Sequence, residues 1–329
     1  MACSFSGIQP TGDIHLGNYL GALRFWVSEQ GRHDCFFSIV DLHAITSSHV
    51  PVDLQAKTLD TAATLYAVGI DPSASTLFVQ SQVHEHAELA WILNCVTAFG
   101  ELQRMTQFKN KSSGKRETRA TAGLFIYPVL QAADILLYQA ERVVVGEDQR
   151  QHIELARTLA ERFNRRFGQV FTTPQTVIPT MGARIMDLQD PRKKMSKSSE
   201  SQYGTLHLMD TPEVIQDKIR TAVTDSGRDI VASAGKPAIT NLLTIYSALI
   251  GEDLKAAEEK FAKSSYAQFK STLAEALIET LRPIRKRYES WVESREEITR
   301  CLQAGADRAE AVASVTLNSV FERIGFLSG

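Results

Sequence analysis

The sequence lacks the marks of several protein classes. Its 329 residues include only four cysteines, Cys3, Cys35, Cys95 and Cys301, which lie far apart and form no CxxC or His-Cys spacing. This distribution suggests neither a zinc site nor a disulfide framework, so we interpret the cysteines as free thiols in a reducing cytoplasm. The amino terminus has no basic stretch followed by an apolar core, and no apolar run is long enough to span a bilayer. We therefore expect a cytoplasmic protein that is not bound to a membrane.

An excess of charge of one sign is also missing. The chain has 36 Lys and Arg against 38 Asp and Glu, a net charge of −2, so the molecule as a whole has no field that would attract a nucleic acid. Any contact with a polyanion must come from local clusters, and the sequence has two basic segments, residues 104–119 and 282–287. The first contains Arg104, Lys109, Lys111, Lys115, Arg116 and Arg119 against the single acid Glu117.

The pattern that is present is typical of a folded α/β protein of about two domains. A content of 43% hydrophobic and 22% charged residues argues against disorder. Short apolar, β-branched runs near residues 4–9, 34–41, 75–80 and 142–146 are each followed by helical patterns, at 17–30, 52–68, 84–99 and 149–167. This alternation predicts βαβ units around a parallel sheet. Ligands of such sheets bind outside the carboxyl ends of the strands, where Gln9, His43 and the turn 146–148 are expected.

The second half of the chain has a different pattern. After Pro179 comes a loop rich in Lys, Ser and Asp, over residues 187–202. Helical periodicity then continues to Phe326 without a convincing strand. The economical interpretation is a second, all-helical domain.

The segment HLGN, residues 15–18, lies between a Gly/Pro/Thr loop and a helix. A helix amino terminus presents unpaired N–H groups and a positive dipole end, and Gly17 removes the side chain that would keep a phosphate away. His15 and Asn18 can add side-chain donors. Alone, the segment is a weak signal, and a helix start with an unrelated histidine is the alternative.

The segment DPRKKMSKSSE, residues 190–200, concentrates ammonium and hydroxyl groups in one loop. Lys194, Ser196, Lys197 and Ser198 suit pyrophosphate, whose negative charge grows as the α-phosphorus is attacked. A solvated charged linker is the alternative. The word KMSKS is specific, and its place nearly 180 residues after HLGN favours the phosphate-binding function.

With both segments, the chain resembles the class I aminoacyl-tRNA synthetases, with HLGN in place of the HIGH signature. It is more narrowly similar to bacterial tryptophanyl-tRNA synthetases over essentially its whole length. The shared words are FSGIQPTG, GNYLGAL, VDLHAIT, GELQRMTQFK, YPVLQAADILLY, GEDQRQHIEL and GARIMDL. The family tolerates asparagine for the second histidine of HIGH, since an amide also donates hydrogen bonds.

The resemblance implies an α/β fold with a Rossmann-like parallel sheet in a catalytic domain and a C-terminal all-helical domain. The expected division is a catalytic domain with a dimer-interface insertion at 1–184, the KMSKS loop at 185–205 and an anticodon-binding domain at 206–329. The expected reaction activates L-tryptophan with ATP as the adenylate, releases pyrophosphate and transfers the amino acid to tRNA(Trp). The resemblance also implies Mg²⁺ with the ATP, and a homodimer.

The resemblance further assigns residues to ATP and to catalysis. The expected ATP contacts are Gln9, Pro10, Thr11, Gly17, Asn18, Gly146, Glu147, Asp148, Ile185, Lys194, Met195, Ser196, Lys197 and Ser198. The expected catalytic residues are His15, Asn18, Lys111, Lys194 and Lys197, with Lys111 reaching the phosphates. Candidates for the phosphates of the tRNA acceptor stem are Arg104, Lys115, Arg116 and Arg119, for which a solvated surface is the alternative.

The segment YPVLQAAD indicates where the amino acid binds. Pro128 suits a first helical position, which would place Tyr127 at the helix entrance and Gln131, Asp134 and Tyr138 on one face. A carboxylate on such an apolar helix must meet a donor. By resemblance, Asp134 accepts a hydrogen bond from the indole N–H; a helix cap or an arginine partner is the alternative.

The other tryptophan contacts also follow from the resemblance. They are Tyr127 and Gln149 at the ammonium group, Phe5, Val143 and Val145 as apolar walls, and His43 and Gln131. His43 would lie near the adenine and the substrate, with a purely structural histidine as the alternative. Several tryptophan-specific relatives carry methionine where this chain has Gln131, and tyrosine-specific relatives carry glutamine. We expect its amide to turn toward the polar end of the substrate or a water, and to leave the ring to the apolar walls.

Two other functions and one surface remain open at this point. A tyrosyl-tRNA synthetase shares KMSKS and the Tyr-x-x-x-Gln-x-x-Asp helix, but such enzymes have a tyrosine where this chain has Phe5. A catalytically silent tryptophan or nucleotide sensor could keep the same fold, although intact Lys111, Lys194 and Lys197 argue against it. The apolar segment LAWILNCVTAF, residues 89–99, fits a dimer interface or a simple core equally well.

Overall fold

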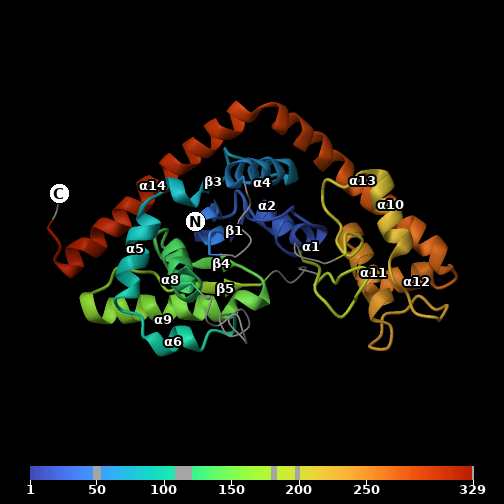
Figure 1. Ribbon diagram of the computed structural model, residues 1–329, viewed down its shortest axis with the longest axis horizontal. Helices are drawn as coiled ribbons and strands as arrows, with labels where there is room; N and C mark the ends of the chain where they lie inside the picture. The colour runs from blue at the N-terminus through green and yellow to red at the C-terminus, as the bar shows by residue number, and fades with distance from the viewer. Residues whose placement is uncertain (47–52, 108–120, 179–183, 197–200, 328–329) are drawn as a thin grey trace.

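The computed structural model describes residues 1–46, 53–107, 121–178, 184–196 and 201–327. Within these ranges, a five-stranded parallel sheet has the order β3-β2-β1-β4-β5 (Figure 1). Its strands are β1 (Cys3–Ile8), β2 (Asp34–Ile39), β3 (Thr76–Val79), β4 (Arg142–Val144) and β5 (Gln175–Val177). The first four match the predicted strands. Strand β5 was not predicted, because its three residues are all at least partly exposed and form no apolar run.

Helices cover both faces of the sheet. They are α4 (Leu54–Val68) on one face and α5 (Glu85–Asn94), α8 (Ala122–Leu136) and α9 (Arg150–Phe167) on the other. Phe37 and Leu77 pack in the core with α4, whereas their neighbours Phe36 and Phe78 pack in the core with α5, α8 and α9. Because successive side chains of a strand point to opposite faces, this alternation buries the sheet on both sides. The predicted Rossmann-like parallel sheet is confirmed.

The chain order reverses between the neighbouring strands β1 and β4. Strands β1, β2 and β3 proceed toward one edge of the sheet, and β4 and β5 proceed toward the other. Phe5 of β1 lies beside Val143 of β4 across this junction. A crevice forms outside the carboxyl ends of strands at such a reversal, so the loops after β1 and β4 border the expected ligand site.

The first long helical segment follows the predicted range 17–30 closely, but it is not uniform. It consists of α1 (Leu16–Asn18), a π-helical stretch η1 (Tyr19–Leu23) and α2 (Arg24–Glu29). π-Helical turns are rare and occur frequently at functional sites. Here the wider turn directly follows HLGN.

Helix α8 begins earlier than its proline suggested. It starts at Ala122, where the hydroxyl of Thr121 accepts a hydrogen bond from the backbone N–H of Leu124 and caps the helix. Pro128 therefore lies inside the helix, so the prediction of a helix start there is wrong, as is the place of Tyr127 at the entrance. A proline removes a single helical hydrogen bond, and the packing of an almost entirely apolar helix outweighs that loss.

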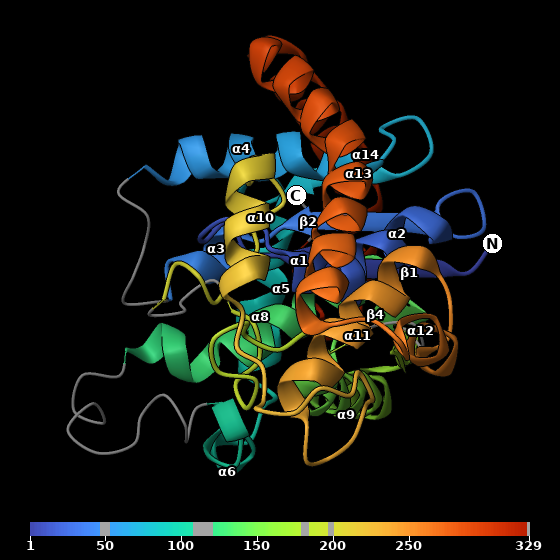
Figure 2. The same cartoon turned by 90° about the vertical axis from the view of Figure 1, so that its right-hand side faces the viewer.

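The described part of the second half is helical, as predicted. Its helices are α10 (Pro212–Thr221), α11 (Pro237–Ile250), α12 (Leu254–Phe261), α13 (Tyr266–Glu293) and α14 (Arg295–Ile324). In both views α10, α11 and α12 gather at one end of the molecule, and α13 runs from them toward α4 (Figures 1 and 2). Tyr66 of α4 stacks on Trp291 of α13, with ring centroids 4.6 Å apart.

Helix α14 returns to the sheet and covers its β3 edge. A Cβ atom at Gly305 would lie 1.9 Å from the carbonyl oxygen of Leu77, so only glycine allows the helix to approach the strand this closely. Covering an edge strand hides its unpaired backbone groups. The last helix thus packs with the sheet, and the boundary at residue 205 stays a prediction. None of the described helices is both long and apolar enough to cross a membrane.

Candidate active site

A cavity of about 430 Å³ lies at the carboxyl ends of β1 and β4. All residues predicted to bind tryptophan line it: Phe5, His43, Tyr127, Gln131, Asp134, Val143, Val145 and Gln149. Three predicted ATP contacts, Gln9, Thr11 and Asn18, line it as well. The structure therefore brings members of both predicted sets together where the strand order reverses. The function of each residue stays a prediction.

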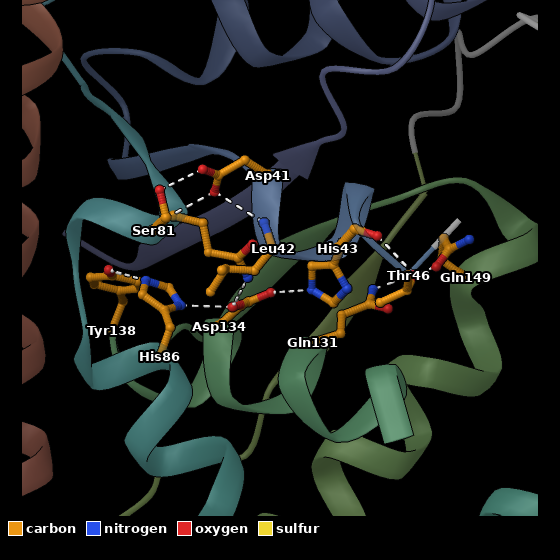
Figure 3. Close-up of polar contacts among 11 residues, drawn as sticks. Asp41, Leu42, His43, Thr46, Ser81, His86, Gln131, Asp134, Tyr138 and Gln149 are labelled. Atoms are coloured by element: carbon orange, nitrogen blue, oxygen red, sulfur yellow. Dashed lines mark hydrogen bonds and ion pairs between the residues drawn. The ribbon is translucent and has the colours of Figure 1, made fainter. Parts of the chain in front are cut away.

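Asp134 forms one end of this cavity and is almost completely buried. Its Oδ2 lies 2.8 Å from His43 Nε2, and its Oδ1 lies 2.6 Å from both Gln80 Nε2 and His86 Nδ1. Figure 3 shows the two histidines approaching the carboxylate from opposite sides. Among the described residues its partners are thus two histidines and a glutamine. Within the described ranges, Asp134 neither caps a neighbouring helix nor pairs with an arginine.

The same contacts decide the charge of Asp134. Burial raises the pKa of its carboxyl, but the charge and hydrogen bond of His43 and the hydrogen bond of His86 outweigh burial and hold the pKa well below its usual range. Asp134 is therefore an ionised, acceptor-only group in an otherwise apolar helix. His43 follows β2 directly, in α3 (Asp41–Ala44), and it both lines the cavity and supports Asp134.

Tyr127 lines a more polar part of the cavity. Its hydroxyl donates to Gln107 Oε1 at 2.8 Å and also lies 2.9 Å from His152 Nε2. Because a phenol has one proton, the imidazole must donate in the second bond. Burial raises the pKa of Tyr127, so the hydroxyl stays neutral. Nearby, Gln131 Nε2 lies 3.5 Å from Gln149 Oε1, so the Gln131 amide is directed toward Gln149 (Figure 3).

HLGN forms a reciprocal cap at the start of α1. His15 Nδ1 accepts from the backbone N–H of Asn18 at 3.3 Å, and Asn18 Oδ1 accepts from the backbone N–H of His15 at 3.1 Å. A Cβ at Gly17 would lie 3.0 Å from the His15 ring, which gives the glycine a structural reason beside the predicted one. Leu16 N also donates to the carbonyl of Leu206 at 2.8 Å, which ties HLGN to the chain that follows the KMSKS loop.

The described part of the KMSKS loop lies against the turn after β4. Lys194 Nζ is 3.5 Å from Asp148 Oδ1, and both side chains are more than half exposed. Burial raises the pKa of the Asp148 carboxyl. The hydrogen bond from Gln149 and the charge of Lys194 lower it by more, so the pKa lies below its usual value. In the same turn, Glu147 is paired with Arg150 at 2.7 Å.

The remaining predicted ATP contacts divide into exposed and buried groups. Gly146 is exposed, whereas the side chains of Pro10, Ile185 and Met195 are buried. Met195 N donates to the carbonyl of Ile185 at 3.0 Å, so these two positions hold the base of the loop together. The carbonyl of Ser196 accepts from Thr205 Oγ1 at 3.1 Å. Lys111, Lys197 and Ser198 lie outside the described residues.

The two basic segments have different surroundings. In the carboxyl-terminal one, Arg285 donates to the carbonyl of Asp210 at 2.7 Å and Arg287 to that of Ala67 at 2.6 Å. Both guanidinium groups therefore hold α13 in place. In the first segment Arg104 is exposed, and the other candidates for the acceptor stem, Lys115, Arg116 and Arg119, lie outside the described residues.

The apolar segment 89–99 is partly core and partly surface. Leu89 and Leu93 are fully buried, whereas Trp91 and Phe99 are 72% and 66% exposed. Phe99 begins α6 (Phe99–Gln103) and packs against Phe125, with ring centroids 4.8 Å apart. The segment thus has buried core residues and exposed aromatic side chains, so a dimer interface stays a prediction.

One group of metal-ligating side chains occurs among the described residues, outside the set that lines the cavity. Ligand atoms of His84, Glu85 and Glu310 lie within 4.8 Å of one another. His84 Nδ1 is 3.5 Å from Glu85 and its Nε2 is 3.7 Å from Glu88. Ion pairs of an exposed histidine with acids of α5 account for this arrangement, and we assign no metal to it.

Sequence reasoning missed four polar residues around the cavity: Gln80, His86, Gln107 and His152. The sequence did contain a hint of Gln80 and His86. A buried carboxylate requires hydrogen-bond donors, and few polar residues interrupt the neighbouring apolar runs. Nothing in the local pattern indicates which of those residues reaches Asp134. Gln80 and His86 are 54 and 48 positions away along the chain.

Comparison with known proteins identifies the family. The family described as class I tRNA synthetases for tryptophan and tyrosine matches residues 2–282. The tryptophan–tRNA ligase 2 of Streptomyces avermitilis is 53% identical over 324 residues, covering 98% of this chain and 96% of that protein. The crystal structure of tryptophanyl-tRNA synthetase from Mycoplasma pneumoniae has a TM-score of 0.91 and 41% identity, covering 100% of this chain and 99% of that one. That of the Campylobacter jejuni synthetase, complexed with ADP and tryptophan, has a TM-score of 0.82 and 32% identity, covering 98% and 100%. The chain therefore belongs to the class I tRNA synthetases and, within them, to the tryptophan–tRNA ligases.

Proposed function

We propose that the cavity at the carboxyl ends of β1 and β4 activates L-tryptophan with ATP, and that the resulting tryptophanyl-adenylate is the donor for tRNA(Trp). The observation that carries the proposal is the composition of this cavity. A buried, ionised carboxylate lies at one end, and residues of HLGN and of the loop after β1 belong to the same lining. An amino-acid side chain and a nucleotide can thus meet in one space. The ADP and tryptophan named for the Campylobacter jejuni structure are the same pair of ligand types.

At the amino-acid end, Asp134 accepts a hydrogen bond from the indole N–H. An ionised carboxylate can only accept, so it favours a ring that presents a donor. Phe5, Val143 and Val145 provide apolar surface for the ring. An apolar ring gains roughly 25 cal/mol for each Å² removed from water, and the hydrogen bond then sets its orientation.

The ammonium group of tryptophan binds at the polar side of the cavity, to Tyr127 and Gln149. The Tyr127 hydroxyl is held by His152 and Gln107, so its position is set before the substrate arrives. Gln131 belongs to this polar side, because its amide is directed toward Gln149. This interpretation explains how a glutamine can occupy the position without disturbing the ring.

At the nucleotide end, a carboxylate oxygen of tryptophan attacks the α-phosphorus of ATP. The bond from this phosphorus to the bridging oxygen breaks, and pyrophosphate leaves with the electron pair. Lys194, Lys197 and Lys111 stabilise the charge that develops on the leaving group. The amino terminus of the helix at His15 and Asn18 contacts the phosphates, and the loop residues Gln9, Pro10 and Thr11 contact the rest of ATP. The other predicted ATP contacts follow the same assignment: Gly17, Gly146, Glu147, Asp148, Ile185, Met195, Ser196 and Ser198.

Mg²⁺ fits this site as a companion of the phosphates. The described carboxylates among the predicted ATP contacts are Glu147 and Asp148, and cationic side chains already pair with both. Mg²⁺ retains several waters and is commonly bound through substrate phosphates with one or two carboxylates. We therefore propose that phosphate oxygens and water provide most of its ligands, and that it neutralises phosphate charge.

The macromolecular functions are assigned to other surfaces. The basic segment 104–119 contacts the acceptor stem, and residues 206–329 contact the anticodon region. A homodimer forms through the exposed aromatic face that includes Trp91 and Phe99. The protein acts in the cytoplasm. Replacing Trp91 with glutamate should yield a monomer in analytical ultracentrifugation, and a dimer of unchanged stability would exclude this face.

Amino-acid-dependent exchange between pyrophosphate and ATP tests the proposal. We expect exchange with tryptophan and little with the nineteen other standard amino acids. Comparable exchange with tyrosine would favour the tyrosine-specific alternative. Tryptophan binding without exchange would identify a silent sensor, so the assay separates the three functions.

A further inference from the structure

Two side chains that do not line the cavity hold the carboxylate of Asp134. Gln80 and His86 both donate to Oδ1, each at 2.6 Å, and both are fully buried. Gln80 begins the 3-10 helix η2 (Gln80–Gln82) directly after β3, and His86 lies in the first turn of α5. The carboxylate is therefore supported by elements that have no contact with a ligand in the cavity.

The chain of contacts continues to a buried phenol. Nε2 of His86 lies 2.8 Å from the hydroxyl of Tyr138, which follows α8 and is 2% exposed. Among the described residues this imidazole nitrogen is the hydroxyl's hydrogen-bond partner. Burial and the nearby negative charge of Asp134 raise the pKa of Tyr138, so the hydroxyl keeps its proton.

One arrangement of protons satisfies all of these groups. If Tyr138 donates to Nε2 of His86, the ring carries its proton on Nδ1 and donates it to Asp134. His86 is then neutral, which suits a fully buried imidazole, and the network holds one negative charge, on Asp134. In Figure 3 the three residues lie in this order, Tyr138, His86 and Asp134, with His43 on the far side of the carboxylate.

The network also determines which oxygen can accept another hydrogen bond. A carboxylate has about four lone-pair positions, two on each oxygen. Oδ1 already accepts from Gln80 and His86, whereas Oδ2 accepts from His43. A further position therefore remains on Oδ2, the oxygen on the side of His43, which itself lines the cavity.

We propose that His86, oriented by Tyr138 and assisted by Gln80, is a positioning residue that fixes the rotamer and the charge of Asp134 and thereby sets the affinity for tryptophan. The inference rests on the proposed function, because it assumes that Asp134 meets the indole N–H. Preorganisation of this kind reduces the ordering that the substrate would otherwise have to impose on the carboxylate.

Several other titratable groups surround this network. His43 faces Asp134 from α3, while Glu85 of α5 and Cys3 of β1 lie close enough to Tyr138 to raise its pKa. The ring of His43 also packs edge-to-face with the Tyr127 ring, and the Tyr127 hydroxyl is hydrogen-bonded to His152 of α9. Of the three histidines, only His43 lines the cavity, whereas His86 and His152 lie behind it.

The test measures kcat and KM for tryptophan in tryptophan-dependent pyrophosphate exchange. In His86→Leu we expect KM to rise roughly 10-fold to 100-fold, the effect of losing a hydrogen bond to a charged group, with a smaller change in kcat. A purely structural role would instead change kcat as much as KM.

Two further variants and a control keep the test decisive if His86→Leu folds poorly. The amide nitrogen of His86→Asn lies about where Nδ1 lies, so this variant should recover most of the affinity. Tyr138→Phe should shift KM in the same direction as His86→Leu, by a smaller amount. The control is Tyr66→Phe, since the buried Tyr66 hydroxyl has no hydrogen-bond partner in the part of the chain that the structure describes, and its loss should leave KM unchanged.

The outcomes separate this inference from the proposed function. If Asp134→Ala impairs tryptophan activation while His86→Leu and Tyr138→Phe keep the wild-type KM, the proposed function stands and the positioning role is overturned. If Asp134→Ala itself has wild-type tryptophan kinetics, the site assignment fails and this inference fails with it. Shifts in His86→Leu and Tyr138→Phe that are absent in Tyr66→Phe would support the inference.

Discussion

The two ends of the cavity satisfy their charged groups in different ways. At the amino-acid end, Asp134 is 1% exposed and accepts short hydrogen bonds from three side chains, all buried. At the nucleotide end, Asp148 and Lys194 are 57% and 55% exposed and approach each other only to 3.5 Å. The carboxylate at the amino-acid end is thus held in one position by short hydrogen bonds, whereas the carboxylate at the nucleotide end makes a single, longer contact with its lysine.

The difference fits the two tasks that we propose for these ends. Recognition of a neutral indole requires an acceptor whose position and charge are set before the substrate binds. The charge on pyrophosphate, in contrast, develops during the reaction, so the cations that stabilise it must be free to meet it. An exposed ion pair contributes little stability, so Lys194 can leave Asp148 at small cost. The site is therefore most rigid at the end that we propose selects the amino acid.

The largest effect is expected from removing the buried carboxylate. Asp134→Ala leaves the indole N–H and three buried donors unpaired, which should cost roughly 2–4 kcal/mol in kcat/KM for tryptophan. The affinity for ATP should barely change. Steady-state exchange kinetics provide the measurement. Glu147→Ala, at the nucleotide end, is the matched control, because the exposed Glu147 side chain pairs with Arg150 and its loss should leave KM for tryptophan unchanged. An equal rise in that KM in both variants would remove the distinction between the two ends.

A loss of activity of similar size is expected at the nucleotide end, but in kcat and not in KM for tryptophan. Lys194→Ala should lower kcat of activation by a factor on the order of 10², with little change in ATP binding, because its contact strengthens in the transition state. The neighbouring Lys193 is a suitable control, since it is exposed and lies 3.8 Å from Asp190 in a surface ion pair. Single-turnover measurements separate the steps. An effect confined to KM for ATP would contradict the role in charge stabilisation.

Stability should respond to pH differently at the two carboxylates. Because the folded pKa of Asp134 is lowered, its contribution to stability is present above the unfolded pKa of about 3.9 and is lost as the pH falls through the folded value. Below about pH 4 the unfolding free energy of the wild type should therefore fall more steeply than that of Asp134→Asn, by up to about 1.4 kcal/mol per pH unit. Chemical denaturation at a series of pH values measures this slope. Asp148→Asn should change the slope much less, and equal slopes in the two variants would contradict the comparison.

The smallest effect is expected at Gln131. Gln131→Met should retain activity with tryptophan, because the glutamine amide is directed toward Gln149 and leaves the ring to apolar walls. Discrimination against tyrosine should persist at a factor of roughly 10² or more. The measurement is kcat/KM for both amino acids in the wild type and the variant. A variant that no longer activates tryptophan would mean that Gln131 contacts the substrate directly.

Local sequence patterns were sufficient for the elements whose signal is contiguous. The strands β1 to β4 and the helices that follow them match periodicity and β-branched runs, and HLGN and KMSKS are words of neighbouring residues. Local patterns did not predict the structure where packing against residues far away in the sequence decides it. Helix α8 continues through Pro128 because its faces pack against other elements, and β5 forms because β4 offers a free edge.

For the site, the amino-acid sequence was enough to show which chemical groups are available and to place Gln9, His43 and the turn 146–148 at the carboxyl ends of the strands. It did so because these groups are fixed by short-range spacing and by the rule that parallel strands end at one edge. Only the tertiary structure decided that Gln80 and His86 hold Asp134, and that Gly305 brings α14 against Leu77. These contacts join residues far apart in the chain, and whether they form depends on the packing of whole helices against the sheet.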